Sequence, residues 1–172
     1  MAITPDTKDW TWVLERPCPD CGFEASAVQR GDLAGDVLRL GSEWQSVVLR
    51  EGSALRVEPD KWSALEYACH VRDVFTLFAS RISMMLAQDG VRFENWDQDA
   101  TAREQRYELQ DPAHVARELE EAALALSFVF TTIGDDQWAN RGLRSNGSEF
   151  TVETLGIYLI HDPIHHLWDV SI

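Results

Sequence analysis

Three histidines have the types and spacing to bind a metal ion. His161 and His165 lie four residues apart near the C-terminus, and His70 lies in the middle of the chain. In a helix, side chains four residues apart share one face, which lets two imidazoles bind one ion. A third imidazole would leave one position open, which is typical of catalytic rather than structural zinc sites. From this spacing we hypothesise that the three histidines form a metal centre. The alternative is that each is an ordinary, partly buried side chain.

Carboxylates near these histidines could support them and move protons. Asp73 follows His70 by three residues, and Asp169 lies one turn beyond His165. Each could accept the second ring proton of a histidine ligand. Asp162 lies between the paired histidines. Asp73 and Asp162 are therefore our candidates for proton transfer in catalysis.

Two further residues of the last helix could affect the geometry or the surroundings of the His161 and His165 pair. Pro163 lies between the paired histidines, removes one helical amide donor and permits a kink that could adjust the ligand angles. His166 lies about 100° round the helix from His165. We interpret His166 as a surface residue or as a support for a ligand.

A second motif, Cys18-Pro-Asp-Cys21-Gly22, has the form of one half of a zinc knuckle. A structural zinc normally has four ligands, and the sequence contains no second Cys-x-x-Cys. Cys18 and Cys21 are thus candidates for a second metal site that is shared across a dimer or completed by acidic or histidine side chains. A redox dithiol and a vestigial motif are the alternatives. Cys69 is interpreted as a small buried residue.

Three residues could contact a substrate. Arg141 and Arg144 precede the last helix and could pair with a carboxylate, although ordinary solvated arginines have the same appearance. Trp96 lies in a long segment without apolar periodicity and could line a pocket, or simply pack on the helices. We predict Arg141, Arg144 and Trp96 as substrate-binding residues.

Apolar residues at spacings of three and four predict four long helices. Their starts are marked by a capping box at Ser63, by Asp111 before a proline, and by Thr151. The expected elements are helices over 32–52, 63–90, 111–134 and 151–170, a loop over 91–110 and a short hairpin over 141–150. The fold predicted is an all-α four-helix bundle over 31–172, after an irregular arm over 1–30 that contains the Cys-x-x-Cys motif.

Composition limits the class of protein. The 172 residues fit a single domain. No apolar run is long enough to span a membrane, and the N-terminus lacks a signal-peptide pattern, so we expect a cytoplasmic protein without a membrane partner. With 29 acidic and 15 basic side chains the net charge is −14, which disfavours nucleic acid as a partner.

Two segments resemble the DinB/YfiT-like superfamily of four-helix-bundle metalloenzymes. They are Trp62-Ser-Ala-Leu-Glu-Tyr-Ala-Cys-His70-Val-Arg-Asp73 and Tyr158-Leu-Ile-His161-Asp-Pro-Ile-His165-His166. In that family one histidine of the second helix and a His-x-x-x-His pair of the last helix bind a divalent metal. The resemblance therefore implies His70, His161 and His165 as ligands of zinc or nickel, with iron and manganese as further candidates.

The resemblance also implies a reaction class. Relatives include mycothiol-dependent maleylpyruvate isomerase and bacillithiol S-transferases, whose metal activates a thiolate. We therefore expect a thiol-dependent S-transferase or isomerase that acts on a small molecule with a low-molecular-weight thiol as cosubstrate, and we expect a homodimer. The alternatives are a metal-dependent hydrolase and a non-catalytic bundle that binds metal or senses redox state.

Overall fold

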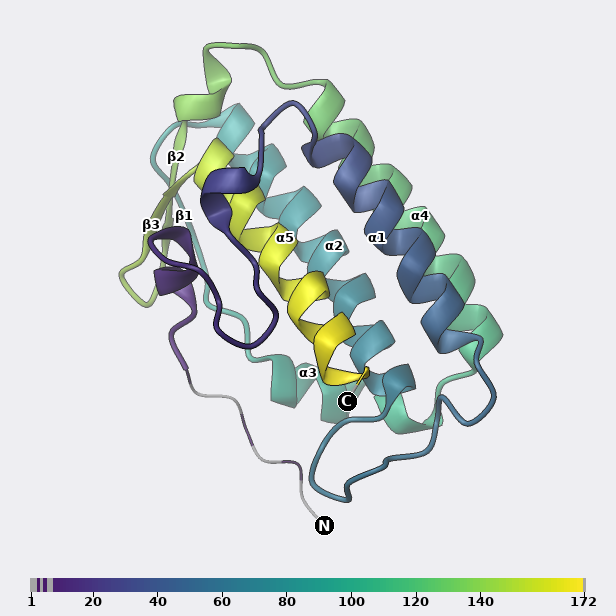
Figure 1. The fold of residues 1–172 in the computed structure, drawn as a ribbon. Helices are drawn as coiled ribbons and strands as arrows, with labels where there is room; N and C mark the ends of the chain where they lie inside the picture. The colour runs from purple at the N-terminus through teal and green to yellow at the C-terminus, as the bar shows by residue number, and fades with distance from the viewer. Residues whose placement is uncertain (1–2, 4, 6–7, 172) are drawn as a thin grey trace.

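Four long helices pack side by side in the computed structural model, which describes Ile3, Pro5 and residues 8–171. They are α1 (Leu33–Val48), α2 (Ala64–Ala87), α4 (Pro112–Thr131) and α5 (Val152–Asp169). Figure 1 shows α5 at the front of the bundle, α2 behind it, and α1 and α4 together on one side. The predicted all-α four-helix bundle is confirmed.

Local sequence signals explain where these helices begin. The Ser63 hydroxyl accepts a hydrogen bond from the Glu66 amide, and the Glu66 carboxylate accepts one from the Ser63 amide, which together form the predicted capping box. Asp111 caps α4 through the amide of His114 at 2.8 Å. Thr151 caps α5 through the amide of Thr154 at 3.1 Å. Each cap satisfies an amide that would otherwise lack a partner.

The core lies between the helices. The apolar face predicted for the first helix is buried. Trp44, near the C-terminal end of this face, is fully buried and donates its indole proton to the Pro163 carbonyl at 3.1 Å. Gly41 lets α1 approach α4, because a Cβ there would lie 2.7 Å from the Cβ of Ala123. The Trp44 side chain therefore joins α1 to α5 at Pro163, between His161 and His165.

The segment over 91–110 contains regular structure, so the prediction of a loop was wrong there. It forms β1 (Val91–Phe93), the short helix α3 (Gln98–Glu104) and the 3₁₀ turn η3 (Tyr107–Leu109). The Asp97 carboxylate caps α3 through the Ala100 amide at 2.8 Å. These elements are too short to produce the extended periodicity that predicts a helix or a strand.

A small sheet lies beside the helices (Figure 1). Its strands are β1, β2 (Arg141–Arg144) and β3 (Glu149–Thr151), in that order, with β1 parallel and β3 antiparallel to β2. β2 and β3 form the predicted hairpin, and Gly147 in its turn has a φ of 97°. The sequence did not predict β1, which is only three residues long.

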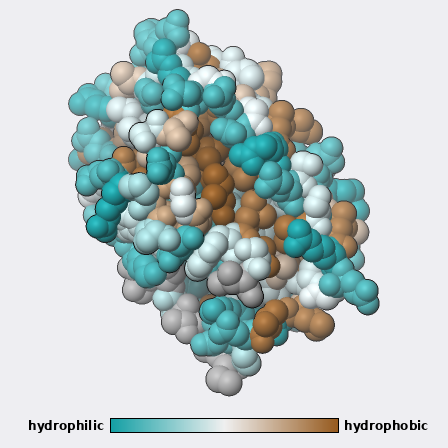
Figure 2. Space-filling view, in the orientation of Figure 1, coloured by the Kyte–Doolittle hydropathy of each residue, from teal (hydrophilic) through white to brown (hydrophobic). Residues whose placement is uncertain are grey.

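The N-terminal arm crosses the front of α5 (Figure 1). Among the residues of the arm that the structure describes, the regular elements are the 3₁₀ turns η1 (Thr11–Leu14) and η2 (Ala25–Ala27). A similar turn, η4 (Gln137–Ala139), precedes β2. Val13, Cys18 and Phe23 of the arm are buried. Figure 2 shows a mostly hydrophilic surface on this side, with apolar side chains along a strip near its middle. In the part of the chain that the structure describes, no helix is long and apolar enough to cross a membrane.

Candidate metal centres

Helix α5 contributes side chains to two separate groups that could hold a metal ion. In each group the candidate ligand atoms all lie within 4.8 Å of one another. The first group is His70, Asp162 and His166, and the second is Cys18, Cys21, His161 and His165. Consecutive residues point about 100° apart on a helix. The pair His161 and His165 and the pair Asp162 and His166 have the same spacing but are offset by one residue. The two pairs therefore lie on different faces of α5.

The three histidines predicted as one site are divided between these groups. His161 and His165 lie together, with ring centroids 5.1 Å apart, but their neighbours are the cysteines of the arm. His70 lies with Asp162 and His166, and its ring centroid is 5.0 Å from that of His166. Within the described residues, no metal-binding group contains all three predicted ligands.

The first group is centred on the Asp162 carboxylate. Its Oδ1 lies 3.2 Å from Nε2 of His70 and 3.9 Å from Nε2 of His166. His70 comes from α2 and is fully buried, whereas the Asp162 side chain is 30% exposed. One face of the group is therefore packed among side chains, and the other is open to small molecules.

A carboxylate also positions the second histidine of this group. Nδ1 of His166 donates to Oδ2 of Asp169 at 2.8 Å. Asp169 was predicted to support His165, and the structure places it on His166 instead, one residue further round the helix. A carboxylate on one ring nitrogen fixes the ring and leaves the other nitrogen as the donor to an ion.

His166 is the functional candidate that the sequence interpretation missed. Its spacing from Asp162 equals the spacing of His165 from His161. Asp-x-x-x-His was thus as good a metal-binding signal as His-x-x-x-His, because carboxylates and imidazoles both bind divalent ions.

Electrostatics favour an ionised Asp162 in the first group and neutral His161 and His165 in the second. Burial raises the pKa of Asp162, but His70 and His166 outweigh it and hold the pKa at about 2. Burial, together with neighbouring His165, lowers the pKa of His161 to about 4, and burial also lowers that of His165. Ionised carboxylates and neutral imidazoles are the protonation states that bind metals.

Unpaired buried atoms fit an ion in the first group. Oδ1 of Asp162 is buried and accepts no hydrogen bond within the described structure, whereas Oδ2 accepts one from Nε2 of His70 at 3.3 Å. Leaving a charged oxygen buried and unpaired is unfavourable, and an ion between the three side chains would pair it. Two imidazoles and one carboxylate are also an established ligand set of catalytic zinc.

A pocket of about 910 Å³ borders both groups along α5, because His161 and His165 line it together with residues of the first group. Asp162 and His166 line it, and the predicted residues Arg144 and Trp96 line it as well. The Trp96 ring stacks on that of His70, with centroids 5.3 Å apart and planes 10° apart. Trp96 thus belongs to the wall of this pocket.

The other predicted substrate-binding residue lies elsewhere. Arg141 is not among the residues that line this pocket. Its guanidinium pairs with the Asp89 carboxylate at 2.9 Å in an exposed contact. Arg141 and Asp89 therefore join β2 to the end of α2.

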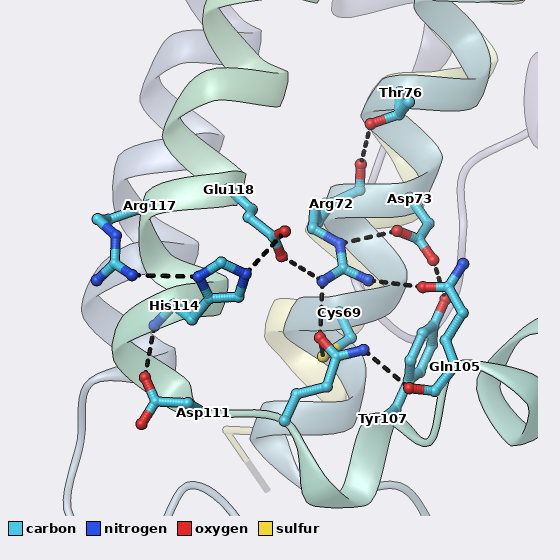
Figure 3. A network of polar contacts seen from close by, with 11 residues as sticks. Cys69, Arg72, Asp73, Thr76, Gln105, Tyr107, Asp111, His114, Arg117 and Glu118 are labelled. Atoms are coloured by element: carbon cyan, nitrogen blue, oxygen red, sulfur yellow. Dashed lines mark hydrogen bonds and ion pairs between the residues drawn. The ribbon is translucent and has the colours of Figure 1, made fainter.

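Asp73 takes part in a different polar network, shown in Figure 3. Its carboxylate accepts hydrogen bonds from Nε of Arg72 at 2.8 Å and from the Tyr107 hydroxyl. Arg72 also donates to Glu118 at 2.6 Å. Burial and the Asp73 carboxylate raise the pKa of Tyr107, which keeps the hydroxyl protonated as a donor. Asp73 was predicted to support His70, but its two oxygens are engaged here instead.

The second group lies where the arm meets α5. Sγ of Cys18 is 3.6 Å from Nδ1 of His165, and Cys21 completes the group from the same turn of the arm. Burial raises the pKa of Cys21 to about 11. Cys69 lies apart from both groups: it is buried in the core, and its sulfur contacts Gln110.

Comparisons with known proteins agree with this architecture. The profile of the DinB superfamily matches residues 6–170. Among solved structures, YfiT from Bacillus subtilis superposes with a TM-score of 0.72 at 17% identity, over 83% of this chain and 86% of that one. YfiT is described as a probable metal-dependent hydrolase with an unusual four-helix bundle topology. At this identity the likeness shows a shared fold. No curated protein matches this sequence.

Proposed function

The chain belongs to the DinB superfamily, and from this premise we propose that it is a metal-dependent hydrolase whose ion is held by His70, Asp162 and His166. The observation that carries the proposal is the group itself, in which three candidate ligand atoms lie within 4.8 Å of one another beside a pocket. The fold shared with YfiT, a probable metal-dependent hydrolase, supports the same reaction class.

The three ligands determine what the site can do. Three protein ligands leave a coordination position open, and an ion bound there lowers the pKa of water or a thiol toward neutrality. Asp162 contributes a negative charge, and Asp169 holds the His166 ring in place at 2.8 Å. Asp162 therefore acts as a ligand in this proposal, rather than as the proton carrier predicted from the sequence.

The pocket walls would bind the substrate. Arg144 is held by hydrogen bonds to Asn146 at 2.9 Å and to Ser148 at 3.1 Å, and its guanidinium carbon lies 5.9 Å from the Tyr158 ring centroid. A guanidinium fixed in this way can pair with an anionic group of a substrate. Trp96 covers His70 on another side and limits the access of water to that ligand.

Thiol transfer is the second candidate, and the size of the pocket favours it. A volume of about 910 Å³ accommodates a small substrate together with a cosubstrate. None of the described residues that line the pocket is a cysteine. The thiol would therefore come from solution as a low-molecular-weight cosubstrate such as mycothiol.

The test combines metal content with turnover. Purified protein loaded with Zn²⁺ would be assayed on a panel of esters and amides, and on electrophiles with and without mycothiol. We expect His70→Ala and Asp162→Asn to lose one equivalent of metal and most of the activity. His114→Ala is the matched control, because this histidine is exposed on α4. Unchanged metal content and turnover in both ligand variants would refute the proposal, and dependence on added thiol would select transfer over hydrolysis.

A further inference from the structure

We propose that Cys18, Cys21, His161 and His165 bind a second divalent ion, zinc or one of similar softness, which fastens the N-terminal arm to α5. The four side chains each offer one ligand atom, and these atoms all lie within 4.8 Å of one another. This site shares no residue with the group of His70, Asp162 and His166. It is therefore independent of the proposed catalytic ion.

The donor set indicates the kind of ion and its role. Two thiolates and two imidazoles are the ligands of tetrahedral structural zinc, and a site with four protein ligands has no open position for a substrate. The sequence alone showed only one half of such a site. The structure supplies the missing ligands from α5 of the same chain, about 140 residues away in the sequence.

The backbone of the arm holds the two cysteines in a tight turn. The Gly22 amide donates to the Cys18 carbonyl at 2.9 Å, and the Cys18 amide donates to the Phe23 carbonyl at 2.9 Å. Gly22 has a φ of 73°, a conformation that favours glycine. These bonds fold the chain back between Cys18 and Phe23, so that both sulfurs reach the same two histidines.

Burial and an unpaired nitrogen provide an independent reason for an ion. Cys18, His161 and His165 are 1%, 4% and 8% exposed, and Nε2 of His161 is buried with no hydrogen-bond partner in the described structure. The only hydrogen bond that Cys18 makes to these histidines is a long one, at 3.6 Å to Nδ1 of His165. A buried polar nitrogen without a partner is unfavourable, and an ion would provide that partner.

Apolar rings surround the site and connect it to the rest of the arm. The Trp10 ring centroid lies 4.8 Å from that of His165, and the Phe23 centroid lies 5.2 Å from that of His161. Trp10 also lines the large pocket. Backbone hydrogen bonds in the described part of the arm, such as that from the Val13 amide to the Trp10 carbonyl, join residues within the arm. An ion that joins the arm to α5 would therefore hold this pocket wall in place.

Cobalt loading under reducing conditions tests the proposal. Co²⁺ bound to thiolates gives an intense sulfur-to-metal absorption in the near ultraviolet that nitrogen and oxygen ligands do not give. We expect the wild-type protein to bind two equivalents of Co²⁺ and to show this absorption. The variant Cys18→Ser/Cys21→Ser should lose one equivalent and the whole absorption. Cys69→Ala, which removes a buried thiol outside the site, should keep both.

A reciprocal variant separates the two sites. His70→Ala should retain the sulfur-to-cobalt absorption while it loses the other equivalent. Far-ultraviolet circular dichroism would show whether the double cysteine variant is folded. If the double variant is not folded, two other spectra test the proposal. They are that of the wild type and that of Cys21→Ser, which changes only the less buried of the two cysteines. A wild-type spectrum without the sulfur-to-cobalt absorption, or a folded double variant that retains two equivalents, would overturn the proposal.

Discussion

His166 donates its Nδ1 proton to Asp169 at 2.8 Å, and Nε2 of the same ring lies 3.9 Å from the Asp162 carboxylate. Asp169 therefore sets the orientation of a candidate ligand without being one. Loss of such a supporting carboxylate typically weakens metal affinity by about 10- to 100-fold. We expect Asp169→Ala to weaken binding at the first site by this factor, as measured by competition with a chromophoric chelator.

A matched control distinguishes this effect from a general loss of negative charge. Asp135→Ala removes a carboxylate that is 99% exposed and pairs with Arg30 at 3.7 Å. It should leave both metal affinities unchanged. Equal affinities in Asp169→Ala and the wild type would contradict the role assigned to Asp169.

Asp73 should matter for stability and not for metal binding. Its carboxylate accepts hydrogen bonds from Arg72 and the Tyr107 hydroxyl, and the side chains of Arg72 and Asp73 are largely buried (Figure 3). Asp73→Asn removes the charge that both donors face. We expect the free energy of unfolding in urea to fall by about 1–3 kcal/mol, with unchanged metal content. Loss of one metal equivalent in this variant would show that Asp73 belongs to the first site after all.

The helices and their caps were predictable because their signals are local. The Ser63–Glu66 capping box, the Asp111 cap before a proline and the Thr151 cap are formed by residues within one turn of one another. The short elements between 91 and 110 depend instead on tertiary contacts. β1, for example, pairs with β2 about 50 residues later in the sequence.

The division of the histidines could not be predicted from spacing. His161 with His165 and Asp162 with His166 have the same separation, and only their rotation about α5 decides which pair faces His70. That rotation is fixed by the packing of the whole bundle and by the arm, which covers the His161 face. A one-residue offset in the sequence thus places a side chain in a different candidate metal site.

Stability should fall at acidic pH through Glu66. Burial raises the pKa of Glu66, but hydrogen bonds from Arg56 and from the Ser63 amide outweigh it and leave the pKa below its ordinary value. A lowered folded-state pKa contributes stability that is present above the unfolded value of about 4.3 and is lost as the pH falls through the folded value.

Thermal melts of the wild type and Glu66→Gln between pH 7 and pH 3 measure this contribution. We expect the wild type to be more stable at pH 7 by about 1–3 kcal/mol, because a charged hydrogen-bonded pair is lost in the variant. The difference should shrink as the pH falls below about 4.3, where Glu66 of the unfolded wild type becomes protonated, and should be lost once the pH passes the lower pKa of the folded state. A difference that stays constant over this range would show that the ionisation of Glu66 is not the cause.

The two arginines near the hairpin should differ in their effect on substrate binding. Arg144 lines the large pocket, whereas Arg141 pairs with Asp89 at 2.9 Å outside it. A charge-assisted hydrogen bond contributes about 1.5–3 kcal/mol, which corresponds to roughly 10- to 150-fold in affinity. For an anionic substrate, Arg144→Gln should therefore raise KM within this range, while Arg141→Gln leaves KM unchanged.

Steady-state kinetics on anionic and neutral substrates of the same size make the test specific, because the loss of the positive charge of Arg144 should not affect binding of the neutral substrate. An equal rise in KM for both substrates would assign Arg144 to the packing of Phe150 and Tyr158 instead of to substrate recognition.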